Sequence, residues 1–592
     1  MPLVQPARAL PLLLLLAFFS AAAASGSSPS GTLQLDFRPT WSNQDLPRPS
    51  WPAPIPSANL RLERLDFLLS NLALRHSDGS WLQSQDWFAF VSQSQPSVLP
   101  PATGLPAERF TAIRFQIGVP PAPNAADPSQ WPPNHALHPD TNRLHWGWQG
   151  GYVFLALEGK TTLPGLPPSG FSYHLATDPF LTQVELPVSF QGGGPLTLRI
   201  TLDVATLLDG IDPSRDPSST HSRPGDPLAP RLAANLARAF RIHSTHPDLF
   251  QPLATTPHQT PPPLGTTPQT LDITHRFPQV ALPADNPLTR EGIALGESLF
   301  HDTRLSINNT QSCASCHDRT TAFSDSRRVS LGAEGQIGKR QSMPLFNLAW
   351  AKSFFWDGRA PSLRQQVLMP IQDPHEMNLP LDQAVTRLSK KSPAFNAAFG
   401  SPEITPDRIA KALEQYLLTL ISQDGRFDRA ARKVDTLTEQ EKRGLQLFVT
   451  EHDPARGLFG ADCFHCHGGT LFTDHSFKNN GLDLSPDDLG LMATTGKPSD
   501  KAKFKTPSLR NIAATAPYMH DGRFDTLEQV VAHYSGPLTR TDTLDPNLAK
   551  HPAAGIQLSP DDQQALVAFL KTLTDEAFLN SGKSGPSLAK QP

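Results

Sequence analysis

Two short stretches of this chain, Cys313-Ala314-Ser315-Cys316-His317 and Cys463-Phe464-His465-Cys466-His467, repeat one pattern and contain all 4 of its cysteines. The pattern C-x-x-C-H is typical of covalent haem attachment, in which two thiols add across the haem vinyl groups and the histidine ligates the iron. A redox dithiol does not require the histidine, and neither a zinc site nor a pair of small disulfides requires the duplication. The repeat therefore predicts two covalent c-type haems, one on Cys313, Cys316 and His317 and one on Cys463, Cys466 and His467.

The first residues have the order of a secretory signal peptide. Arg8 is followed by an apolar run over 10–19 and by small residues over 20–24, which predicts a signal peptide over 1–24. The apolar run is shorter than the roughly 20 residues that a membrane-spanning helix needs, and no cysteine that could carry a lipid follows it. We therefore expect export to the periplasm or secretion, and no membrane span in the mature chain, rather than a membrane anchor.

The composition narrows the class of protein. A chain of 592 residues is too long for one hydrophobic core, so several domains are expected. A net charge of −4 favours neither a nucleic-acid partner nor a basic membrane-binding surface. The 61 prolines indicate long loops, whereas 32 Phe and 9 Trp are too many for a disordered chain. The sequence thus predicts a folded, loop-rich protein of several domains.

The first half of the chain, over 32–248, has the pattern of an all-β antiparallel sandwich closed by a helical stretch over 227–242. Short runs of strand-forming residues alternate with turn clusters, most clearly at 60–74, 110–119, 152–157 and 196–204. Nine of the forty residues from 251 to 290 are proline. This density predicts a semi-rigid linker over 249–272.

The second half is predicted to be mainly helical. Residues 409–421 place apolar side chains at helical spacing, and Thr438 with Glu441, like Ser559 with Asp562, has the spacing of a helix N-cap. One haem motif lies on each side of a junction near residue 430. We therefore expect two cytochrome-c-like lobes, over 273–430 and 431–580.

The remaining iron ligands distinguish an electron carrier from an enzyme. No histidine occurs between His317 and His375, so the first iron has no evident second protein ligand. An iron with an open position can bind peroxide, whereas a fully ligated iron only transfers electrons. The pattern favours a peroxide-reactive first haem, and a di-haem electron carrier is the alternative.

Two further blocks resemble the bacterial di-haem cytochrome c peroxidases and the MauG enzymes. The first is Phe355-Trp356-Asp357-Gly358-Arg359 with Gln366, Pro370 and Glu376-Met377, and the second comprises 506–511 (TPSLRN) and 517–522 (PYMHDG). The resemblance covers roughly 275–578. It implies a peroxidase-type enzyme with hydrogen peroxide as substrate and, in the peroxidases, a small electron-carrier protein as partner.

The resemblance also implies roles for single residues of the first block. Trp356 corresponds to the tryptophan between the two haems. Gln366 and Pro370 correspond to positions of the peroxidatic pocket, and Glu376 corresponds to its acid–base residue.

Around the second haem, the resemblance points to MauG rather than to ordinary peroxidases. Tyr534 stands where MauG has a tyrosine and the peroxidases have a methionine, so it is expected to be the iron ligand opposite His467. The family also implies calcium between the haems, bound at Thr515 and Pro517. Gln341 stands where many members have an asparagine ligand to that ion.

The first half resembles the MbnP-like family of copper-binding proteins. The resemblance is carried by 145–155 (HWGWQGGYVFL) with Glu158-Gly159, and by 65–72, 115–119, 173–175 and 223–228. In that family a MauG-type partner, MbnH, oxidises a tryptophan of the copper protein to kynurenine. This chain resembles a fusion of the two proteins.

The fusion implies a substrate tryptophan inside the chain, and Trp146 and Trp148 are the first candidates, with Trp131 third. Trp146 and Trp148 share a strand face, so sandwich core is the alternative role. With no free thiolate, copper would take imidazole ligands. The histidines nearest to the motif are His145, His174 and His135.

These inferences predict an exported di-haem, peroxide-dependent oxidase that converts a tryptophan to kynurenine in its own or a neighbouring MbnP-like domain, with a role in copper binding or homeostasis. One alternative is a di-haem cytochrome c peroxidase that reduces hydrogen peroxide with an electron-carrier protein. The other is a non-enzymatic di-haem electron carrier with a copper-binding domain.

Overall fold

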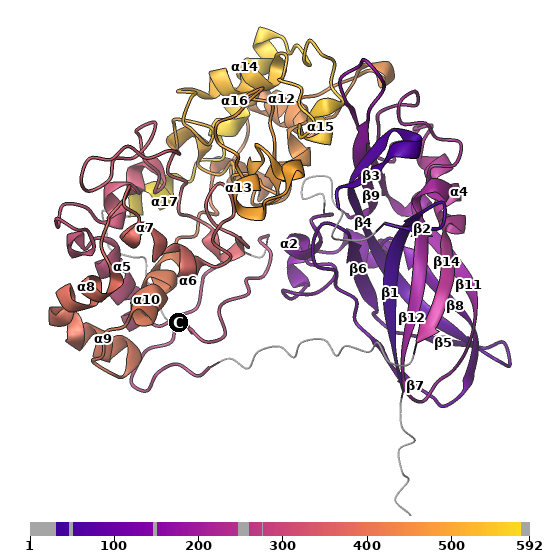
Figure 1. The fold of residues 1–592 in the computed structure, drawn as a ribbon, viewed down its shortest axis with the longest axis horizontal. Helices are drawn as coiled ribbons and strands as arrows, with labels where there is room; N and C mark the ends of the chain where they lie inside the picture. The colour runs from indigo at the N-terminus through magenta and orange to yellow at the C-terminus, as the bar shows by residue number, and fades with distance from the viewer. Residues whose placement is uncertain (1–30, 47–50, 146–150, 247–259, 275, 582–592) are drawn as a thin grey trace, which may run out of the picture.

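A computed structural model describes residues 31–46, 51–145, 151–246, 260–274 and 276–581. Figure 1 shows a β domain beside a helical region whose two lobes form an arc. The predicted signal peptide, Trp146 and Trp148 lie outside the described residues. None of the helices in the described part of the chain has the length and apolar character needed to cross a bilayer.

The β domain consists of two sheets that enclose one core. One sheet has the order β14-β12-β1-β2, with β7 on β1, and the other has the order β11-β8-β4-β9-β10-β13, with β3, β5 and β6 on β4. The bounds are β1 Gly31–Trp41, β2 Gln44–Asp45, β3 Ala53–Ile55, β4 Leu60–His76, β5 Trp81–Gln83, β6 Phe88–Ser92, β7 Ala102–Leu105, β8 Arg109–Ile117, β9 Val153–Thr161, β10 Ser169–Ala176, β11 Thr182–Gln191, β12 Pro195–Asp203, β13 Ser219–Thr220 and β14 Phe240–His246.

Aromatic side chains from both sheets meet between them. The ring of Phe37 on β1 lies 5.8 Å from those of both Phe67 on β4 and Phe115 on β8, in edge-on contacts. All three side chains are buried in one hydrophobic cluster. The predicted sandwich of two sheets is therefore present.

The prediction of a purely antiparallel sandwich is wrong for two strand pairs. β1 pairs with β12 in parallel, and β13 pairs with β10 in parallel. A tight hairpin forces antiparallel pairing, but these partners are joined by long connections that permit either direction.

The helix predicted over 227–242 is shorter than expected. α4 spans Ala229–Ala239, and the chain continues directly as β14. Phe240 is 3% exposed, and its ring packs 5.6 Å from Phe115 in the sandwich core. Burial between the sheets thus outweighs the local helical pattern at this point.

The helical region has two hydrophobic cores, one around each haem motif. Helices of the first lobe are α5 Arg290–Phe300, α6 Leu363–Gln366, α7 Met369–Gln372, α8 Leu381–Arg387, α9 Ser392–Phe399 and α10 Pro406–Leu418. Helices of the second lobe are α11 Arg426–Ala431, α12 Glu439–Phe448, α13 Met492–Thr495, α14 Leu527–Ser535, α15 Pro546–Ala549 and α16 Pro560–Lys571.

The last described helix, α17 (Glu576–Asn580), returns to the first lobe, as Figure 1 shows. Its Phe578 is buried in the first core, with its ring 5.8 Å from that of Phe323. This contact differs from the sequence-based assignment of all of 431–580 to the second lobe.

Both predicted N-caps are confirmed, because Thr438 accepts a hydrogen bond from Glu441 N and Ser559 accepts one from Asp562 N.

The two lobes repeat one close helix crossing. Where α5 meets α10, a Cβ added to Gly296 would lie 2.0 Å from the carbonyl oxygen of Ala412. Where α12 meets α16, a Cβ added to Gly444 would lie 2.0 Å from the carbonyl oxygen of Ala565. Only glycine allows these backbones to approach so closely.

Aromatic pairs flank both crossings. Phe300 and Tyr416 have ring centroids 5.4 Å apart in the first lobe, and Phe448 and Phe569 have ring centroids 5.2 Å apart in the second. In each lobe the helix that carries the glycine precedes the haem motif. An equivalent pair of crossed helices therefore supports the haem motif in each lobe.

The β domain docks on the second lobe through β9, β10 and α15. A Cβ on Gly170 of β10 would lie 1.9 Å from the carbonyl oxygen of Pro546, so the two backbones touch. Lys160 Nζ donates to Asp542 O at 2.8 Å, and Asn547 Nδ2 donates to Glu158 Oε2 at 3.2 Å. These contacts bring the β domain against the lobe that carries the second haem motif.

Gly444→Ala is expected to lower the free energy of unfolding by about 1–3 kcal/mol, because the new methyl group must push α16 away from α12. Gly194→Ala is the control, since no atom lies within 4 Å of the position that its Cβ would take and the change should stay within about 0.5 kcal/mol. Denaturant unfolding followed by circular dichroism measures both. Equal stability of the two variants would contradict the close crossing.

Candidate functional site

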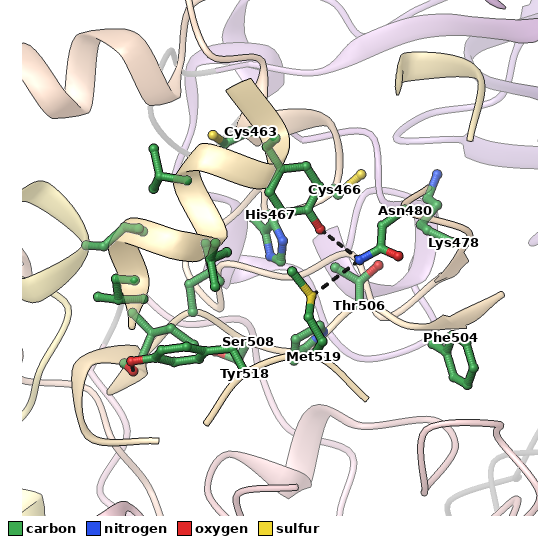
Figure 2. Close-up of a pocket in the computed structure, with 18 of the residues that line it drawn as sticks. Cys463, Cys466, His467, Lys478, Asn480, Phe504, Thr506, Ser508, Tyr518 and Met519 are labelled. Carbon is green, nitrogen blue, oxygen red and sulfur yellow. Dashed lines mark hydrogen bonds between the residues drawn. The ribbon is translucent and has the colours of Figure 1, made fainter. Parts of the chain in front are cut away.

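A cavity in the second lobe brings together residues that the sequence predicted around the second haem. Its wall includes Cys463, Cys466, His467 and Tyr534 of the second lobe and Trp356 of the first. Thr515 and Pro517, the predicted calcium positions, also line it. Figure 2 shows Cys463, Cys466 and His467 at one edge of this cavity, with Asn480, Thr506 and Met519 near them. Its empty volume is about 1590 Å³, including the part open to solvent.

Both motif histidines are oriented in the same way. His317 Nδ1 lies 2.7 Å from Phe323 O, and His467 Nδ1 lies 3.2 Å from Phe472 O. A bond from Nδ1 to a backbone carbonyl fixes the ring and leaves Nε2 as the ligating atom. Burial lowers the pKa of both imidazoles, which favours the neutral form that binds iron. The residues of both motifs therefore fit a c-type haem.

Tyr534 lies on α14, in the wall of the second-lobe cavity. Its hydroxyl oxygen accepts a hydrogen bond of 3.2 Å from Asn480 Nδ2, which also lies 3.4 Å from Met519 Sδ. Burial raises the pKa of Tyr534, so the phenol of the protein alone is neutral. The amide of Asn480 thus orients the hydroxyl oxygen of Tyr534, which the family resemblance implies is a haem ligand.

Trp356 lies at the junction of the lobes. Its Nε1 donates to Gln341 O at 2.8 Å, and the backbone N–H of Gln341 donates to His520 O of the second lobe at 2.9 Å. The carbonyl of Trp356 accepts from Lys505 N at 2.8 Å. Backbone bonds on both sides therefore fix a first-lobe indole in the wall of the second-lobe cavity.

Glu376 lies near the first haem motif, just after α7. Burial, together with the nearby charge of Asp373, raises the pKa of Glu376 to about 7, although Arg359 opposes the shift. Its charge also acts on the thiols of Cys313 and Cys316, whose pKa values burial raises. A carboxyl group with this pKa can both accept and donate a proton near neutral pH.

The other two residues predicted for the peroxidatic pocket lie on neighbouring helices. Gln366 is the last residue of α6, and Pro370 in α7 accepts a hydrogen bond from Met377 N at 3.1 Å through its carbonyl oxygen.

A second cavity lies between the β domain and the second lobe. His145 and His174 line it from the β domain, and Phe464, His465 and His475 line it from the second lobe. Burial lowers the pKa of His145 to about 4 and that of His174 to about 3. Burial, with the charge of Lys550, lowers that of His465 to about 4. These imidazoles are neutral at physiological pH.

The comparisons with known proteins divide the chain at the same place as the structure. Residues 290–436 match the family model described as di-haem cytochrome c peroxidase, and residues 30–222 match the MbnP family model. Methylamine utilization protein MauG of Methylophilus methylotrophus is 35% identical over 303 residues, covering 50% of this chain and 87% of the relative. The chain belongs to the di-haem cytochrome c peroxidase family.

Of two other relatives of this di-haem peroxidase, one is named as a peroxidase and the other is described as MauG-like and associated with copper homeostasis. Cytochrome c551 peroxidase of Pseudomonas aeruginosa is 33% identical over 302 residues, covering 49% of this chain and 80% of the relative. A solved MauG-like protein associated with microbial copper homeostasis is 34% identical, with a TM-score of 0.48, over 53% of this chain and 97% of its own. The family carries two c-type haems and reacts with peroxide, and the MbnP domain is an addition to it.

Three histidines of this di-haem peroxidase meet at the domain boundary. His174 of β10, His221 after β13 and His465 of the second haem motif each place one ring nitrogen within 4.8 Å of the others. His145, instead, contacts Tyr152 with ring centroids 4.7 Å apart. Of the predicted copper histidines, the metal-sized groups found among the described residues include His174 but neither His145 nor His135.

The third substrate candidate, Trp131, belongs to an aromatic group of the β domain. Its indole stacks on the His135 ring, with centroids 4.4 Å apart. Trp146 and Trp148 lie outside the described residues, whereas their neighbour His145 lines the cavity between the domains.

Sequence reasoning missed His221 and His465. His465 occupies a variable position inside the haem motif, and His221 lies two residues before the stretch 223–228 that carries part of the MbnP resemblance. No spacing rule connects three histidines on two domains. The available signals were the imidazole inside the haem motif and the nearness of His221 to the stretch 223–228.

The peroxidase also buries a network of charges where the domains meet. Arg456 of the second lobe pairs with Asp226 of the β domain at 3.1 Å and with Glu451 at 3.0 Å. Glu451 is fully buried and also pairs with His221 at 3.0 Å and Lys550 at 3.0 Å. The network crosses the domain boundary beside the three histidines.

We expect the peroxide reaction to rise with pH through about 7, because Glu376 accepts a proton only when ionised. Glu376→Gln should lower the rate by about 10²–10⁴-fold and remove this pH step. Asp373→Asn should move the step to lower pH, because it removes a neighbouring negative charge. Stopped-flow mixing with hydrogen peroxide over pH 5–9 measures all three. An unchanged pH profile in Glu376→Gln would contradict the role.

Arg456→Met should destabilise the protein by about 3–5 kcal/mol, because it leaves the buried carboxylate of Asp226 without its cation, while Glu451 keeps only Lys550 as a cation. Arg443→Met is the control, since Arg443 pairs with Asp562 at 2.8 Å in a half-exposed setting where the loss should stay below about 1 kcal/mol. Calorimetric unfolding compares the two. Equal losses of stability in the two variants would contradict the larger contribution expected of the buried network.

Proposed function

We propose that this di-haem protein is an exported oxidase that uses peroxide to convert a tryptophan of its own MbnP-like domain, or of a neighbouring copy, to kynurenine. The observation that carries the proposal is the cavity between the domains. His145, which directly precedes Trp146, lines it together with His465, which lies inside the second haem motif. A relay that ends at the second haem therefore ends beside the cavity that His145 lines, one residue before the first candidate tryptophan in the sequence.

The overall reaction balances with two molecules of peroxide. One tryptophan and two H₂O₂ give N-formylkynurenine and two H₂O. The indole thereby loses four electrons and gains two oxygen atoms. Hydrolysis with one H₂O then releases formate and leaves kynurenine. The net change is a mass gain of about 4 Da, from one oxygen gained and one carbon lost. When bound, the haems supply the peroxide chemistry and hold the oxidising equivalents.

The residues of the chain supply the proton and the route between the lobes. Glu376, with a pKa of about 7, takes a proton from peroxide and returns it to the departing oxygen as water forms. Trp356, held by Gln341 and Lys505, is the aromatic step between the first lobe and the second-lobe cavity. Gln366 and Pro370 would shape the peroxidatic pocket beside the first haem, and His467 and Tyr534 would hold the second haem.

Calcium at Thr515 and Pro517 would stabilise the junction of the lobes, because both residues line the second-lobe cavity that Trp356 enters. The match of residues 30–222 to MbnP supports a role in copper binding or homeostasis. The ligands of the copper ion would come from the histidines of the β domain. The candidates predicted from the sequence are His145, His174 and His135.

Trp356→Phe should slow tryptophan oxidation by about tenfold or more, an increase of about 1.4 kcal/mol in the barrier. Trp350→Phe is a matched control, because Trp350 is also buried in the first lobe and its Nε1 donates to a carbonyl, Pro278 O, at 3.0 Å. Peptide mass spectrometry before and after peroxide follows the conversion, and haem absorbance checks that both haems are attached.

The same experiment separates the alternative functions. Peroxide consumption that requires an added reduced electron carrier, with every tryptophan unmodified, would favour the plain cytochrome c peroxidase. An absence of both peroxide consumption and tryptophan oxidation would favour the electron carrier. Equal rates in Trp356→Phe and Trp350→Phe would reject the relay.

A further inference from the structure

The amide side chain of Asn480 lies between two other groups in the wall of the second-lobe cavity. Its Nδ2 lies 3.2 Å from the hydroxyl oxygen of Tyr534 and 3.4 Å from Sδ of Met519. Figure 2 shows Asn480 and Met519 in this cavity, with dashed lines for the two hydrogen bonds of the amide. An amide nitrogen carries two hydrogens, so it can donate to both acceptors at once.

The sulfur of Met519 fixes which end of the amide faces these groups. A thioether sulfur accepts hydrogen bonds and cannot donate one, so the amide nitrogen of Asn480, rather than its oxygen, must face it. The same nitrogen then donates to the oxygen of Tyr534. Among the described residues, that oxygen has no hydrogen-bond partner other than Asn480. The tyrosine oxygen is therefore an acceptor, as a phenolate bound to iron would be.

The backbone around Asn480 is anchored on two sides. Nε2 of His533, which directly precedes Tyr534 in α14, lies 3.1 Å from the carbonyl oxygen of Asn480. On the other side, Asn479 Nδ2 donates to Thr543 Oγ1 at 2.9 Å. The amide is thus held in place relative to the tyrosine oxygen by the chain itself, which is the support that a precise ligand geometry needs.

A hydrogen bond to an iron ligand changes the reduction potential of the iron. A phenolate ligand donates electron density and stabilises the oxidised iron, and a hydrogen-bond donor on its oxygen withdraws part of that density. Hydrogen bonds to the ligands are one of the ways in which a protein sets the potential of a haem. The bond from Asn480 should therefore raise the potential above that of a haem whose phenolate ligand accepts no hydrogen bond.

The proposed reaction makes opposite demands on this potential. A low potential at the second haem favours the storage of oxidising equivalents there, but it weakens them as oxidants of an indole. A methionine ligand would raise the potential and shorten the storage. A phenolate that accepts a hydrogen bond gives a potential between these two cases.

We propose that Asn480 is a positioning residue of the second haem, which orients the phenolate of Tyr534 and raises the potential of the haem through a hydrogen bond to the phenolate oxygen. The inference rests on the proposed ligation by Tyr534. It adds a residue that lies outside both haem motifs and outside the blocks that carry the resemblance to the di-haem peroxidases.

The test is a spectroelectrochemical titration of the di-haem holoprotein, which measures the midpoint potential of each haem. Asn480→Leu removes the donor at similar volume and should lower the potential of the second haem by about 59 mV, which corresponds to a tenfold change in the equilibrium constant of a one-electron couple. The first haem should keep its potential. Met519→Leu is the matched control, because it removes the other acceptor of the same amide and keeps the bond to Tyr534. Its shift should be much smaller.

A second measurement uses the unaltered holoprotein and does not depend on how the variants fold. Resonance Raman spectra should show an iron–phenolate vibration that shifts in D₂O, because the amide hydrogens of Asn480 exchange with solvent. Haem absorbance verifies that each variant keeps both haems, and the shift in D₂O decides if Asn480→Leu does not.

The possible failures are distinguishable. A spectrum without an iron–phenolate vibration would reject Tyr534 as a ligand and, with it, the role of Asn480. A vibration that is present but does not shift in D₂O would reject only the role of Asn480. Equal potentials in Asn480→Leu and the unaltered protein, or equal shifts in Asn480→Leu and Met519→Leu, would reject that role as well and leave the proposed oxidase function intact.

Discussion

Buried charges that pair across the domain boundary determine how the β domain sits on the haem region. Glu451 is fully buried, and its partners include His221 of the β domain, while Arg456 reaches across to Asp226. A buried charge that loses its partner is strongly destabilising, so this orientation is set by pairing rather than by apolar area. The cavity between the domains and the position of His465 in it follow from this arrangement.

The two lobes share one framework but have different surroundings. Both rest on a glycine-mediated helix crossing, and both motif histidines bond a backbone carbonyl. The variable positions of the motifs differ, however, with Ala314-Ser315 in the first lobe and Phe464-His465 in the second. Phe464 contacts His221 of the β domain, with ring centroids 5.7 Å apart. The second motif thus serves as a docking surface as well as a haem-attachment sequence.

Local patterns were readable from the sequence, and long-range contacts were not. The haem motifs, the caps at Thr438 and Ser559 and the strand over 60–74 depend on residues close together in the chain, and each was predicted. The parallel pairing of β1 with β12 and the return of α17 to the first lobe depend on contacts between distant segments. The same is true of the meeting of His174, His221 and His465, because no periodicity reports which loops of two domains will touch. The family resemblance supplied Tyr534 and Trp356, which spacing alone would not have distinguished from core aromatic residues.

The backbone contact between Gly170 and Pro546 leaves no space on α15 for a second MbnP-like domain while the molecule's own domain is docked. A domain from outside would have to compete with one that is tethered, whose effective concentration is of the order of millimolar for a short linker. Under the proposed function, catalyst and substrate are then present in a fixed ratio of one to one. A molecule that modifies its own domain would do so once, at a rate independent of dilution, and the enzyme would remain the carrier of its own product.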